Sequence, residues 1–365
     1  MKIFNKSEWK KVKLGDICEV ITGNTPSKKI KEYWDKDEVP FITPPELKYE
    51  GINYITPNIF VSKIGAKQGR IIPKNSICVC CIGSLGKLGI LKDDAITNQQ
   101  INSLILKDKN IDLLYLYFYL KTIKNNLESI ASSTTVKIIN KSSFEKIEIS
   151  LPNLEIQKKI SKKLELLENN IDFRKNQLNY LKELNKSLFT RMFGDIKTNS
   201  KNWEVKKIED CILNNVKNIN LKEKGEIAYI DISSINNKEN KILSYKKYNS
   251  ISEAPSRAKK ILNENDILIS TVRPALKNIA IFSEKVLELT IASTGFCILR
   301  AKDTINNKYI FEIIKSDNFT ETLIKKQIGA NYPAISDRDI KSIKIPVPPI
   351  ELQNKFAERT EKIEK

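Results

Sequence analysis

A long central stretch without a helix breaker constrains this chain more than any other feature of its sequence. No Pro and no Gly occurs between Asn153 and Thr190, whereas Pro152 precedes the stretch and Gly194 follows it. Apolar residues recur there at alternating steps of four and three, which is the heptad pattern of a coiled-coil helix. At about 1.5 Å of rise per residue, such a helix is on the order of 55 Å long. We therefore predict a long spacer helix over residues 153–192.

The seam of this predicted helix is narrow and contains two polar interruptions, Arg174 and Asn185. Polar residues within a seam set the register of paired helices, but residues at a skip in the pattern simply face solvent, and the sequence leaves both readings open. A helix packed on its own domain is the alternative to a paired helix. The predicted seam residues are Ile160, Leu164, Leu167, Ile171, Leu178, Leu181 and Leu188, with Phe356 and Ile363 in a shorter second helix.

The order of sequence blocks before the long stretch recurs after it. The block "KIINKSSFEKIEISLPNLEIQKKI" at 137–160 corresponds to "AISDRDIKSIKIPVPPIELQNKF" at 334–356, with Gln353 at the position of Gln157. Such recurrence indicates two copies of one structural unit, each followed by a helix. We predict a first unit at 1–152, the spacer helix at 153–192, a second unit at 193–348, and a short second helix at 349–365.

Within each predicted unit, short strands alternate with turns and with one apolar helix. Two strands, at 76–82 and 87–91, are joined by a Gly-containing turn, and the corresponding block of the second copy places Lys277 at the position of Lys87. We predict an α+β fold, in which two repeated mixed units are linked by a long coiled-coil spacer helix. Further strands are predicted at 39–44, 98–106 and 144–151, and a buried helix at 112–124.

The charge of the chain indicates a polyanionic partner. Lys and Arg number 62 against 44 Asp and Glu, which gives a formal charge of +18 and a pI near 9.4. A balance of this sign is typical of nucleic-acid binding, although a solvated Lys-rich surface would produce it too. No apolar run approaches the roughly 18 residues that a membrane span needs, and no signal peptide is recognisable, so we expect a cytoplasmic protein.

Several enzyme classes are excluded by the residues that the chain lacks. It contains no His, which excludes Ser-His-Asp and Cys-His nucleophile systems and most zinc sites. The "GSLGKLG" turn is not a phosphate-binding loop, because Leu88 follows Lys87 where Ser or Thr is needed. No methyltransferase motif and no cluster of carboxylates for a metal-dependent nuclease is recognisable. Three of the six cysteines, Cys78, Cys80 and Cys81, lie in an apolar stretch that reads as a strand, and we expect core thiols. The sequence predicts a chain without catalytic residues, metal or cofactor.

Polar and basic side chains gather on the predicted connecting segments of both copies. Lys and Arg neutralise phosphates, whereas Arg, Asn and Gln pair with base edges in the major groove of DNA. Any one of them can equally be an ordinary surface residue, and only the clustering indicates function. The candidate DNA-binding residues are Lys29, Lys67, Arg70, Ser84, Lys87, Gln99 and Gln100 in the first copy, and Arg257, Arg273, Lys277, Ser293, Asn331 and Tyr332 in the second.

The doubled order of these motifs resembles the specificity subunit of Type I restriction–modification systems. The matching motifs are "WKKVKLGDICEVITGNTPS", "GSLGKLGIL" with "NQQINSL", "EISLPNLEIQKKI", "MFGD", "STVRPALKNIAIF" with "ASTGFCILR", and "IKIPVPPIELQNKF". Together they cover essentially the whole chain. The resemblance implies two target-recognition domains, at 1–152 and 193–348, each reading one half of a split double-stranded DNA site. It also implies that the two helices pair antiparallel and hold the domains apart.

In the family that this chain resembles, catalysis belongs to partner subunits. The resemblance implies adenine methyltransferase (modification) subunits that use AdoMet, and restriction subunits that use ATP and magnesium. The chain departs from the family pattern in its short second helix, which puts complete pairing of the helices in doubt. Two other classes remain open from the residues alone: a coiled-coil scaffold for protein interactions, and an RNA-binding protein.

Overall fold

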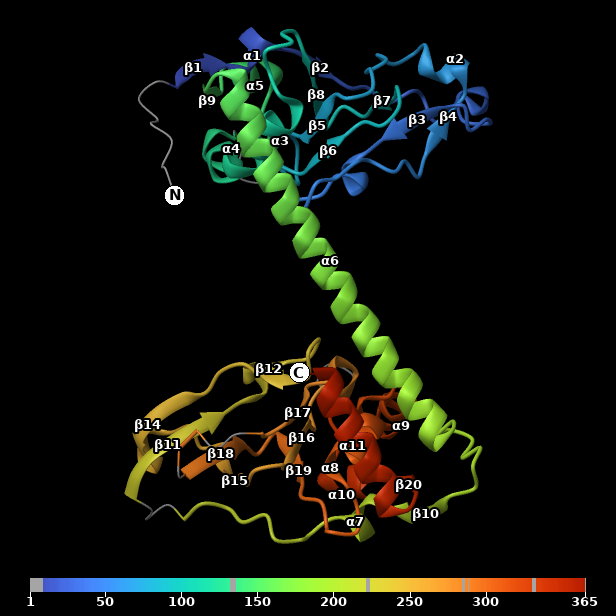
Figure 1. The fold of residues 1–365 in the computed structure, drawn as a ribbon, viewed down its shortest axis with the longest axis vertical. Helices are drawn as coiled ribbons and strands as arrows, with labels where there is room; N and C mark the ends of the chain where they lie inside the picture. Colours follow the sequence, from blue (N-terminus) through green and yellow to red (C-terminus); the bar gives the residue numbers. More distant parts are fainter. Residues whose placement is uncertain are drawn as a thin grey trace. The chain divides into compact units, whose positions relative to one another are not determined.

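The computed structural model describes residues 9–131, 136–220, 224–283, 286–287, 289–329 and 333–364 of the chain. Two compact units are present, Met1–Gln177 (unit 1) and Leu178–Lys365 (unit 2). Each unit combines sheets with short helices, and the long helix α6 (Leu154–Phe193) stands between the two sheet-rich regions in chain order (Figure 1). This arrangement confirms the predicted α+β fold class.

Unit 1 is built on a four-stranded sheet of order β2-β8-β5-β6, in which all neighbours are antiparallel. A second sheet has the order β4-β3-β7, and β1 pairs with β9 next to the start of α6. The elements of unit 1 are β1 (Lys10–Lys13), α1 (Leu14–Ile17), β2 (Cys18–Thr22), β3 (Val39–Ile42), β4 (Phe60–Val61), α2 (Lys63–Ala66), β5 (Ile77–Cys80), β6 (Leu88–Ile90), β7 (Ile96–Thr97), β8 (Ile101–Leu106), α3 (Leu113–Thr122), α4 (Lys124–Ile130), α5 (Lys141–Glu145) and β9 (Glu148–Leu151).

Strand β5 shows why the central sheet of unit 1 is buried on both faces. Ile77 and Val79 join the core that contains the helices, whereas Cys78 and Cys80 join a second core on the other side. Alternate residues of a strand point to opposite faces, so a strand between two cores is apolar throughout. All six cysteines of the chain are free and buried, as predicted for core thiols.

Unit 2 repeats this plan with a larger second sheet. The sheet of order β17-β16-β19 corresponds to the central strands of unit 1, and a sheet of order β14-β11-β18-β15 lies beside it in the same unit (Figure 1). The elements of unit 2 are β10 (Glu204–Lys207), α7 (Ile208–Cys211), β11 (Lys224–Ile230), β12 (Ile235–Asn236), β13 (Lys241–Ile242), β14 (Lys246–Ser250), β15 (Ala258–Ile261), β16 (Ile267–Ser270), β17 (Ile279–Ile281), β18 (Leu289–Ser293), β19 (Phe296–Leu299), α8 (Asn307–Lys315), α9 (Asp317–Lys326), α10 (Asp337–Lys341), β20 (Lys344–Val347) and α11 (Ile350–Glu364).

Two buried glutamines establish the predicted repeat at the level of single hydrogen bonds. The Oε1 atom of Gln157 accepts from the backbone N–H of Asp112 at 2.9 Å, and its Nε2 donates to the Pro152 carbonyl at 2.8 Å. Gln353 makes the same two contacts, with the N–H of Asn306 at 2.9 Å and with the carbonyl of Pro348 at 2.7 Å. The predicted equivalence of the two glutamines is therefore confirmed.

Two details of the predicted repeat are wrong. The strand predicted at 144–151 begins only at Glu148. Phe144 belongs to helix α5, and its apolar side chain reaches the core from that short helix. Lys277 is not the equivalent of Lys87. In unit 1 the Lys87 carbonyl accepts from the backbone N–H of Cys80. In unit 2 the equivalent hydrogen bond runs from the N–H of Ser270 to the carbonyl of Asn278, so Asn278 is the counterpart of Lys87. The turn of unit 2 is longer by one residue, which shifts the register.

Helix α6 has the predicted length of 40 residues and is shifted by one residue from the predicted 153–192, and both of its ends lie inside a core. Leu164 packs against the core of unit 1, whereas Leu188 and Phe193 belong to the core of unit 2. Between these ends, Leu167, Ile171 and Leu178 are 58%, 48% and 59% exposed, so their packing against a partner helix stays a prediction. The spacer is thus shared between the units.

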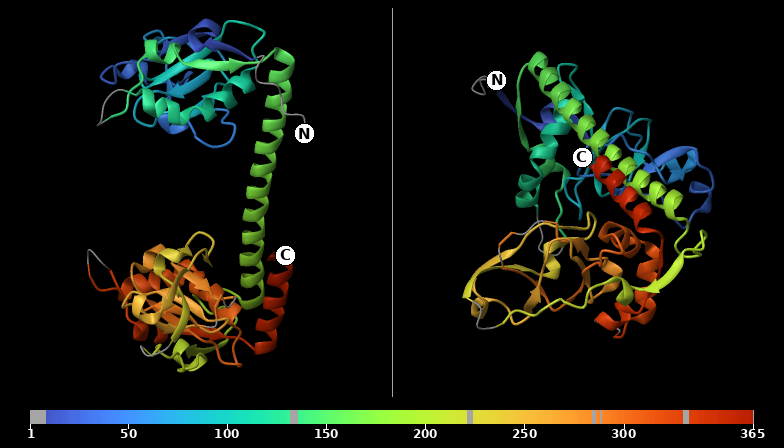
Figure 2. Two further views of the ribbon diagram at one scale, coloured as in Figure 1. Left: turned by 90° about the vertical axis from the view of Figure 1, so that its left-hand side faces the viewer. Right: turned by 60° about the horizontal axis from the view of Figure 1, so that its bottom comes forward.

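The short helix α11 lies beside the C-terminal half of α6 and runs in the opposite direction (Figure 2). The ring of Phe356 on α11 lies 5.3 Å from that of Phe189 and 5.4 Å from that of Phe193. Ile363 is partly exposed near the end of α11, and Leu181 is partly exposed on α6. No helix in the described ranges is long and apolar enough to cross a membrane.

Candidate functional site

An exposed tyrosine next to two lysines forms the most distinctive polar surface of unit 1. The Nζ atom of Lys124 lies 4.0 Å from the centroid of the Tyr49 ring, and that of Lys87 lies 5.6 Å from it. Burial raises the pKa of Tyr49, and the neighbouring Ser84 side chain partly offsets that rise. Ammonium groups at these distances are attracted by the ring face and leave their charge accessible to solvent. We call Tyr49, Ser84, Lys87 and Lys124 the tyrosine–lysine cluster.

The backbone of one tight turn assembles most of this cluster. Gly83 and Gly86 adopt φ values of 78° and 76°, the left-handed region that favours glycine. The turn joins β5 to β6. The first residue of β6, Leu88, exchanges two backbone hydrogen bonds with Lys48. Tyr49 follows Lys48 directly and therefore lies next to the turn. Burial raises the pKa of Tyr49, so its hydroxyl stays protonated at neutral pH.

A second group of predicted residues contacts the end of β2 and the segment that follows it. Gly23 allows this segment to approach β7 closely, because a Cβ atom there would lie 2.2 Å from the Thr97 carbonyl oxygen. Arg70 Nη1 donates to the Thr22 carbonyl at 2.9 Å, and the Thr25 hydroxyl donates to Gln99 Oε1 at 2.6 Å. Arg70 and Gln99 are therefore both bound to this part of the chain, with Gln100 adjacent to Gln99, and the side chains of Lys29 and Lys67 are exposed.

In unit 2 the corresponding turn presents arginine and lysine where unit 1 has glycine. Arg273 and Lys277 adopt φ values of 49° and 51° on either side of a short 3-10 turn, Pro274–Leu276. The side chain of Arg273 is exposed. Left-handed backbone costs a residue with a Cβ atom roughly 1 kcal/mol or more, and such strain gathers at functional positions.

Lys277 has a structural partner that explains its position. Its Nζ atom lies 2.5 Å from Asp317 Oδ1 and 3.4 Å from the Lys315 carbonyl, at the junction of α8 and α9. The ammonium group lowers the pKa of the Asp317 carboxyl by a direct hydrogen bond and by its charge. Lys277 therefore ties the turn to the helices, and its charge is partly neutralised.

The predicted DNA contact of Ser293 does not fit the structure. Ser293 is 1% exposed, and its Oγ accepts a hydrogen bond from the backbone N–H of Gly295. Asn98 of unit 1 makes the equivalent contact with the backbone N–H of Gln100. Both side chains stabilise the turn between two strands. Arg257 is exposed and its carbonyl accepts from Thr294. The predicted residues Asn331 and Tyr332 lie outside the described part of the chain.

Tyr49 and Lys124 were not predicted from the sequence. Tyr49 lies in the segment "ELKYEG", which contains no motif, and Lys124 lies at the start of α4. Their contact depends on the pairing of Lys48 with Leu88, which joins residues far apart in the chain. The excess of lysine in unit 1 was the only available signal.

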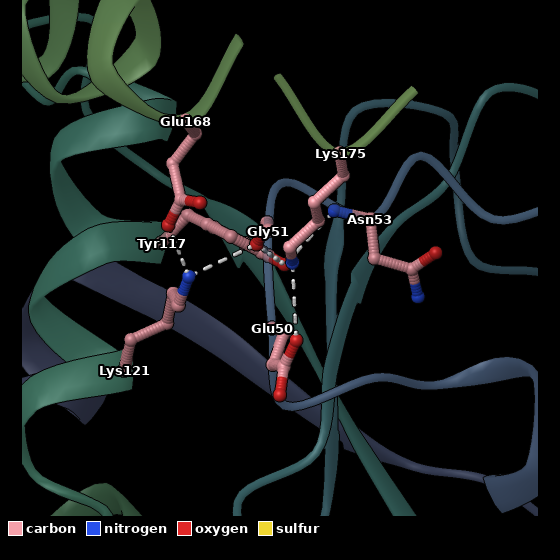
Figure 3. Close-up of polar contacts among 7 residues, drawn as sticks. All are labelled: Glu50, Gly51, Asn53, Tyr117, Lys121, Glu168 and Lys175. Carbon is pink, nitrogen blue, oxygen red and sulfur yellow. Dashed lines mark hydrogen bonds and ion pairs between the residues drawn. The ribbon is translucent and has the colours of Figure 1, made fainter. Parts of the chain in front are cut away.

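Polar contacts fasten the first half of α6 to unit 1 beyond the core. Lys121 of α3 forms an ion pair with Glu168 of α6 at 2.6 Å and also donates to the Gly51 carbonyl at 3.1 Å (Figure 3). Two turns of α6 further on, Lys175 approaches Glu50 at 3.4 Å. The segment that carries Tyr49 is therefore held between α3 and α6.

The described residues contain no group of three or more Cys, Asp or Glu side chains that could hold a metal ion. Burial raises the pKa of Cys78, Cys81 and Cys297 to about 12, so these thiols remain protonated and are poor nucleophiles. The surfaces described above offer cationic and hydrogen-bonding contact. The expectation of a chain without metal or cofactor stays a prediction.

These surfaces define a class of protein with two similar α+β units and cationic turns. A model of the Type I restriction modification DNA specificity domain matches the chain twice, over residues 6–183 and 200–365. The chain therefore belongs to this family, which confirms the resemblance seen in the sequence.

Characterised relatives carry the same description. The chain is 33% identical over 225 residues to the Type I restriction enzyme MjaIX specificity subunit of Methanocaldococcus jannaschii, which is 56% of this chain and 52% of that protein. It is 37% identical over 159 residues to the HindI specificity subunit of Haemophilus influenzae, which is 42% of this chain and 34% of that protein. The matches thus span about half and one third of these relatives. The MjaVIII specificity subunit of M. jannaschii is 27% identical and matches along 98% of this chain and 86% of its own length.

The fold is found in a solved structure of the same description. The crystal structure of a Type I restriction–modification S subunit from M. genitalium superposes with a TM-score of 0.58 at 16% identity, and covers all of this chain and 91% of its own. A structure of a type I restriction–modification system gives a TM-score of 0.53 at 15% identity, over 98% and 90% of the two chains. At these identities the likeness concerns the fold.

Proposed function

We propose that this chain is the specificity subunit of a Type I restriction–modification complex and recognises a specific sequence in double-stranded DNA. Residues 1–152 and 193–348 act as target-recognition domains, each reading one half of the site. Its partners are adenine methyltransferase subunits and restriction subunits, in which AdoMet, ATP and magnesium carry the chemistry. The chain itself binds without catalysing, and it works in the cytoplasm.

The match of one DNA-specificity domain to both copies of the repeat carries this proposal. The names of the three relatives and the formal charge of +18 support it. Equivalent turns of the two units present cations, Lys87 in unit 1 and Arg273 in unit 2, and cations in that position suit phosphates and base edges. The comparisons give no support to a protein-interaction scaffold or to an RNA-binding protein.

The proposal is tested by measuring which nucleic acid the complex binds. The chain is co-expressed with a Type I methyltransferase (modification) subunit, and random-sequence duplex DNA that the complex binds is selected over several rounds. We expect enrichment of a split site with two defined halves. Enrichment of structured RNA over duplex DNA in a competition, or no enrichment of any sequence, would contradict the proposal.

Lysine variants test the tyrosine–lysine cluster within this function. Lys124→Ala should weaken binding to all DNA sequences alike and reduce the slope of log K against log salt by about one, because one phosphate contact is lost. Lys162→Ala, an exposed lysine on α6, serves as the matched control and should change neither quantity. If both variants weaken binding equally, the cluster has no special role and only the overall charge matters.

A further inference from the structure

The turn between β16 and β17 in unit 2 exposes a leucine, whereas the equivalent turn of unit 1 buries one. The turn of unit 1, at 81–87, places Leu85 in the core, where it is 3% exposed. The turn of unit 2, at 271–278, is one residue longer and leaves Leu276 47% exposed. Burial of a leucine stabilises a fold, so unit 2 gives up a stabilising contact at this place.

Hydrogen bonds from other segments of unit 2 hold this turn in position. The backbone N–H of Arg273 donates to the Pro333 carbonyl at 2.8 Å, and Asn237 Nδ2 donates to the Leu276 carbonyl at 2.9 Å. Within the turn, the N–H of Leu276 donates to the Arg273 carbonyl at 2.9 Å. The ion pair of Lys277 fastens the end of the turn to α9. Leu276 is therefore displayed on a backbone that is fixed on both sides.

The backbone that displays Leu276 is also strained. Arg273 and Lys277, which flank the short 3-10 turn, both lie in the left-handed region. Single exposed leucines are common on protein surfaces and need no explanation by themselves. Here, however, the surrounding contacts maintain an unfavourable backbone that turns an apolar side chain toward solvent, and strain of this kind gathers at binding sites.

The neighbours of Leu276 indicate a polyanion that carries an apolar group. Arg273, at the other end of the closed turn, has an exposed cationic side chain. Between the two, Pro274 is buried and Ala275 is small, so Leu276 is the large apolar side chain that this turn exposes. In the major groove of duplex DNA, the 5-methyl group of thymine is the apolar group that the base edges present. Because half of the Leu276 side chain is covered, it is better suited to touch a groove edge than to insert between base pairs.

We propose that Leu276 is a specificity-determining residue of unit 2 and contacts the 5-methyl group of one thymine in the major groove of its half-site. This inference rests on the proposed function and adds the chemical group that one turn reads. The equivalent turn of unit 1 buries its leucine and presents Lys87 next to Tyr49. A methyl contact through this turn is therefore confined to one half of the site.

Replacement of thymine by deoxyuridine removes only the methyl group and tests this contact directly. The probe is the split site selected with the complex of this chain and a methyltransferase subunit, in which each thymine is replaced in turn by deoxyuridine. We expect one position, in one half only, where the replacement weakens binding about fourfold, the value of burying one methyl group. With Leu276→Ala, the thymine and deoxyuridine duplexes should bind equally at that position, while every other position behaves as before.

Leu213→Ala is the matched control. Leu213 is another exposed leucine of unit 2, and its N–H donates to the Arg300 carbonyl beyond the far end of β19. This variant should keep the methyl effect. Both variants should keep the melting temperature of the unsubstituted chain, because both side chains are exposed.

The possible failures of this experiment are distinguishable. A methyl effect that persists in Leu276→Ala, no methyl-sensitive thymine in the site, or an equal loss in both halves would overturn the inference and leave the proposed function intact. Loss of the methyltransferase subunit from the Leu276→Ala complex would assign the turn to a protein contact and would also overturn it. A selection that yields no split site would overturn the proposed function and the inference together.

Discussion

The two ends of α6 are held by different kinds of contact. In unit 2 the helix ends in a cluster of aromatic rings, with Phe193 fully buried against Tyr309. In unit 1 the helix begins with the buried hydrogen bonds of Gln157 and continues with the ion pair between Lys121 and Glu168. The same repeated plan therefore fixes a helix either by apolar burial or by polar ties, and the two solutions should differ in stability.

The central strands of the two units differ in a similar way. Asp266 at the start of β16 is fully buried and forms a two-point ion pair with Arg300, at 2.8 and 2.7 Å. Strand pairing places Ser76 and Ile105 of unit 1 at these positions. At the same end of the two paired strands, unit 2 thus has a buried charge pair, whereas unit 1 has a hydroxyl and an apolar side chain.

The largest effect is expected at the aromatic end of α6. Phe193→Ala should lower the free energy of unfolding of unit 2 by about 3–5 kcal/mol, the range for truncating a buried Phe. Leu164→Ala, at the half-buried end in unit 1, should cost less than half as much. Both losses are measured as free energies of unfolding, from urea denaturation in which hydrogen exchange reports on each unit separately. Equal losses would show that the two ends are anchored alike.

The buried ion pair of unit 2 gives the next largest effect. Arg300→Leu should destabilise unit 2 by about 3 kcal/mol, because it leaves the carboxylate of Asp266 buried without a partner. The double variant Asp266→Ser with Arg300→Ile, which copies unit 1, should recover most of this loss. A double variant as unstable as the single one would indicate that the surroundings of the pair, and not the charge, set the difference.

The strained turn of unit 2 gives a smaller effect, in which a substitution weakens DNA binding without lowering stability. Arg273→Gly should leave stability unchanged or raise it by about 0.5–1 kcal/mol, because glycine adopts the left-handed backbone without strain. DNA binding should weaken by about 1–3 kcal/mol, and only for one half of the site. Thermal unfolding and binding to sites mutated in each half measure the two quantities. A change at both halves would contradict a separate reading by each unit.

The smallest effect concerns the exposed pair of Lys277 and Asp317. The pKa of Asp317 is lowered in the folded chain, so the pair contributes stability above the ordinary carboxyl pKa near 3.8 and loses it as pH falls below that value. Asp317→Asn should cost less than about 1 kcal/mol at pH 7. The difference in stability between the variant and the unsubstituted chain should shrink toward pH 3, and a difference that stays constant would show that the charge of Asp317 is not its cause.

The sequence predicted those features that depend on spacing along the chain. The heptad pattern placed α6 to within a few residues, and the constant spacing of Gln157 and Gln353 placed the repeat. Tertiary features were missed or misplaced. The contact of Tyr49 with Lys124 depends on strand pairing, and the single extra residue in the turn before Lys277 shifts the register. Ser293 lies in a Ser-Thr-Gly sequence that is typical of a surface loop, but its hydroxyl is buried and stabilises a turn.

The exposed centre of α6 also has a consequence for the integrity of the chain. Between Leu167 and Leu178 the helix has no core packing and is held by its own backbone hydrogen bonds and by the ion pairs of Glu168 and Lys175, so it opens locally at less cost than a helix in a core. Lys175 within this region and Lys182 just beyond it are exposed and are trypsin sites. Limited trypsin digestion should therefore cut the chain first near its middle and release two fragments, each retaining its own core.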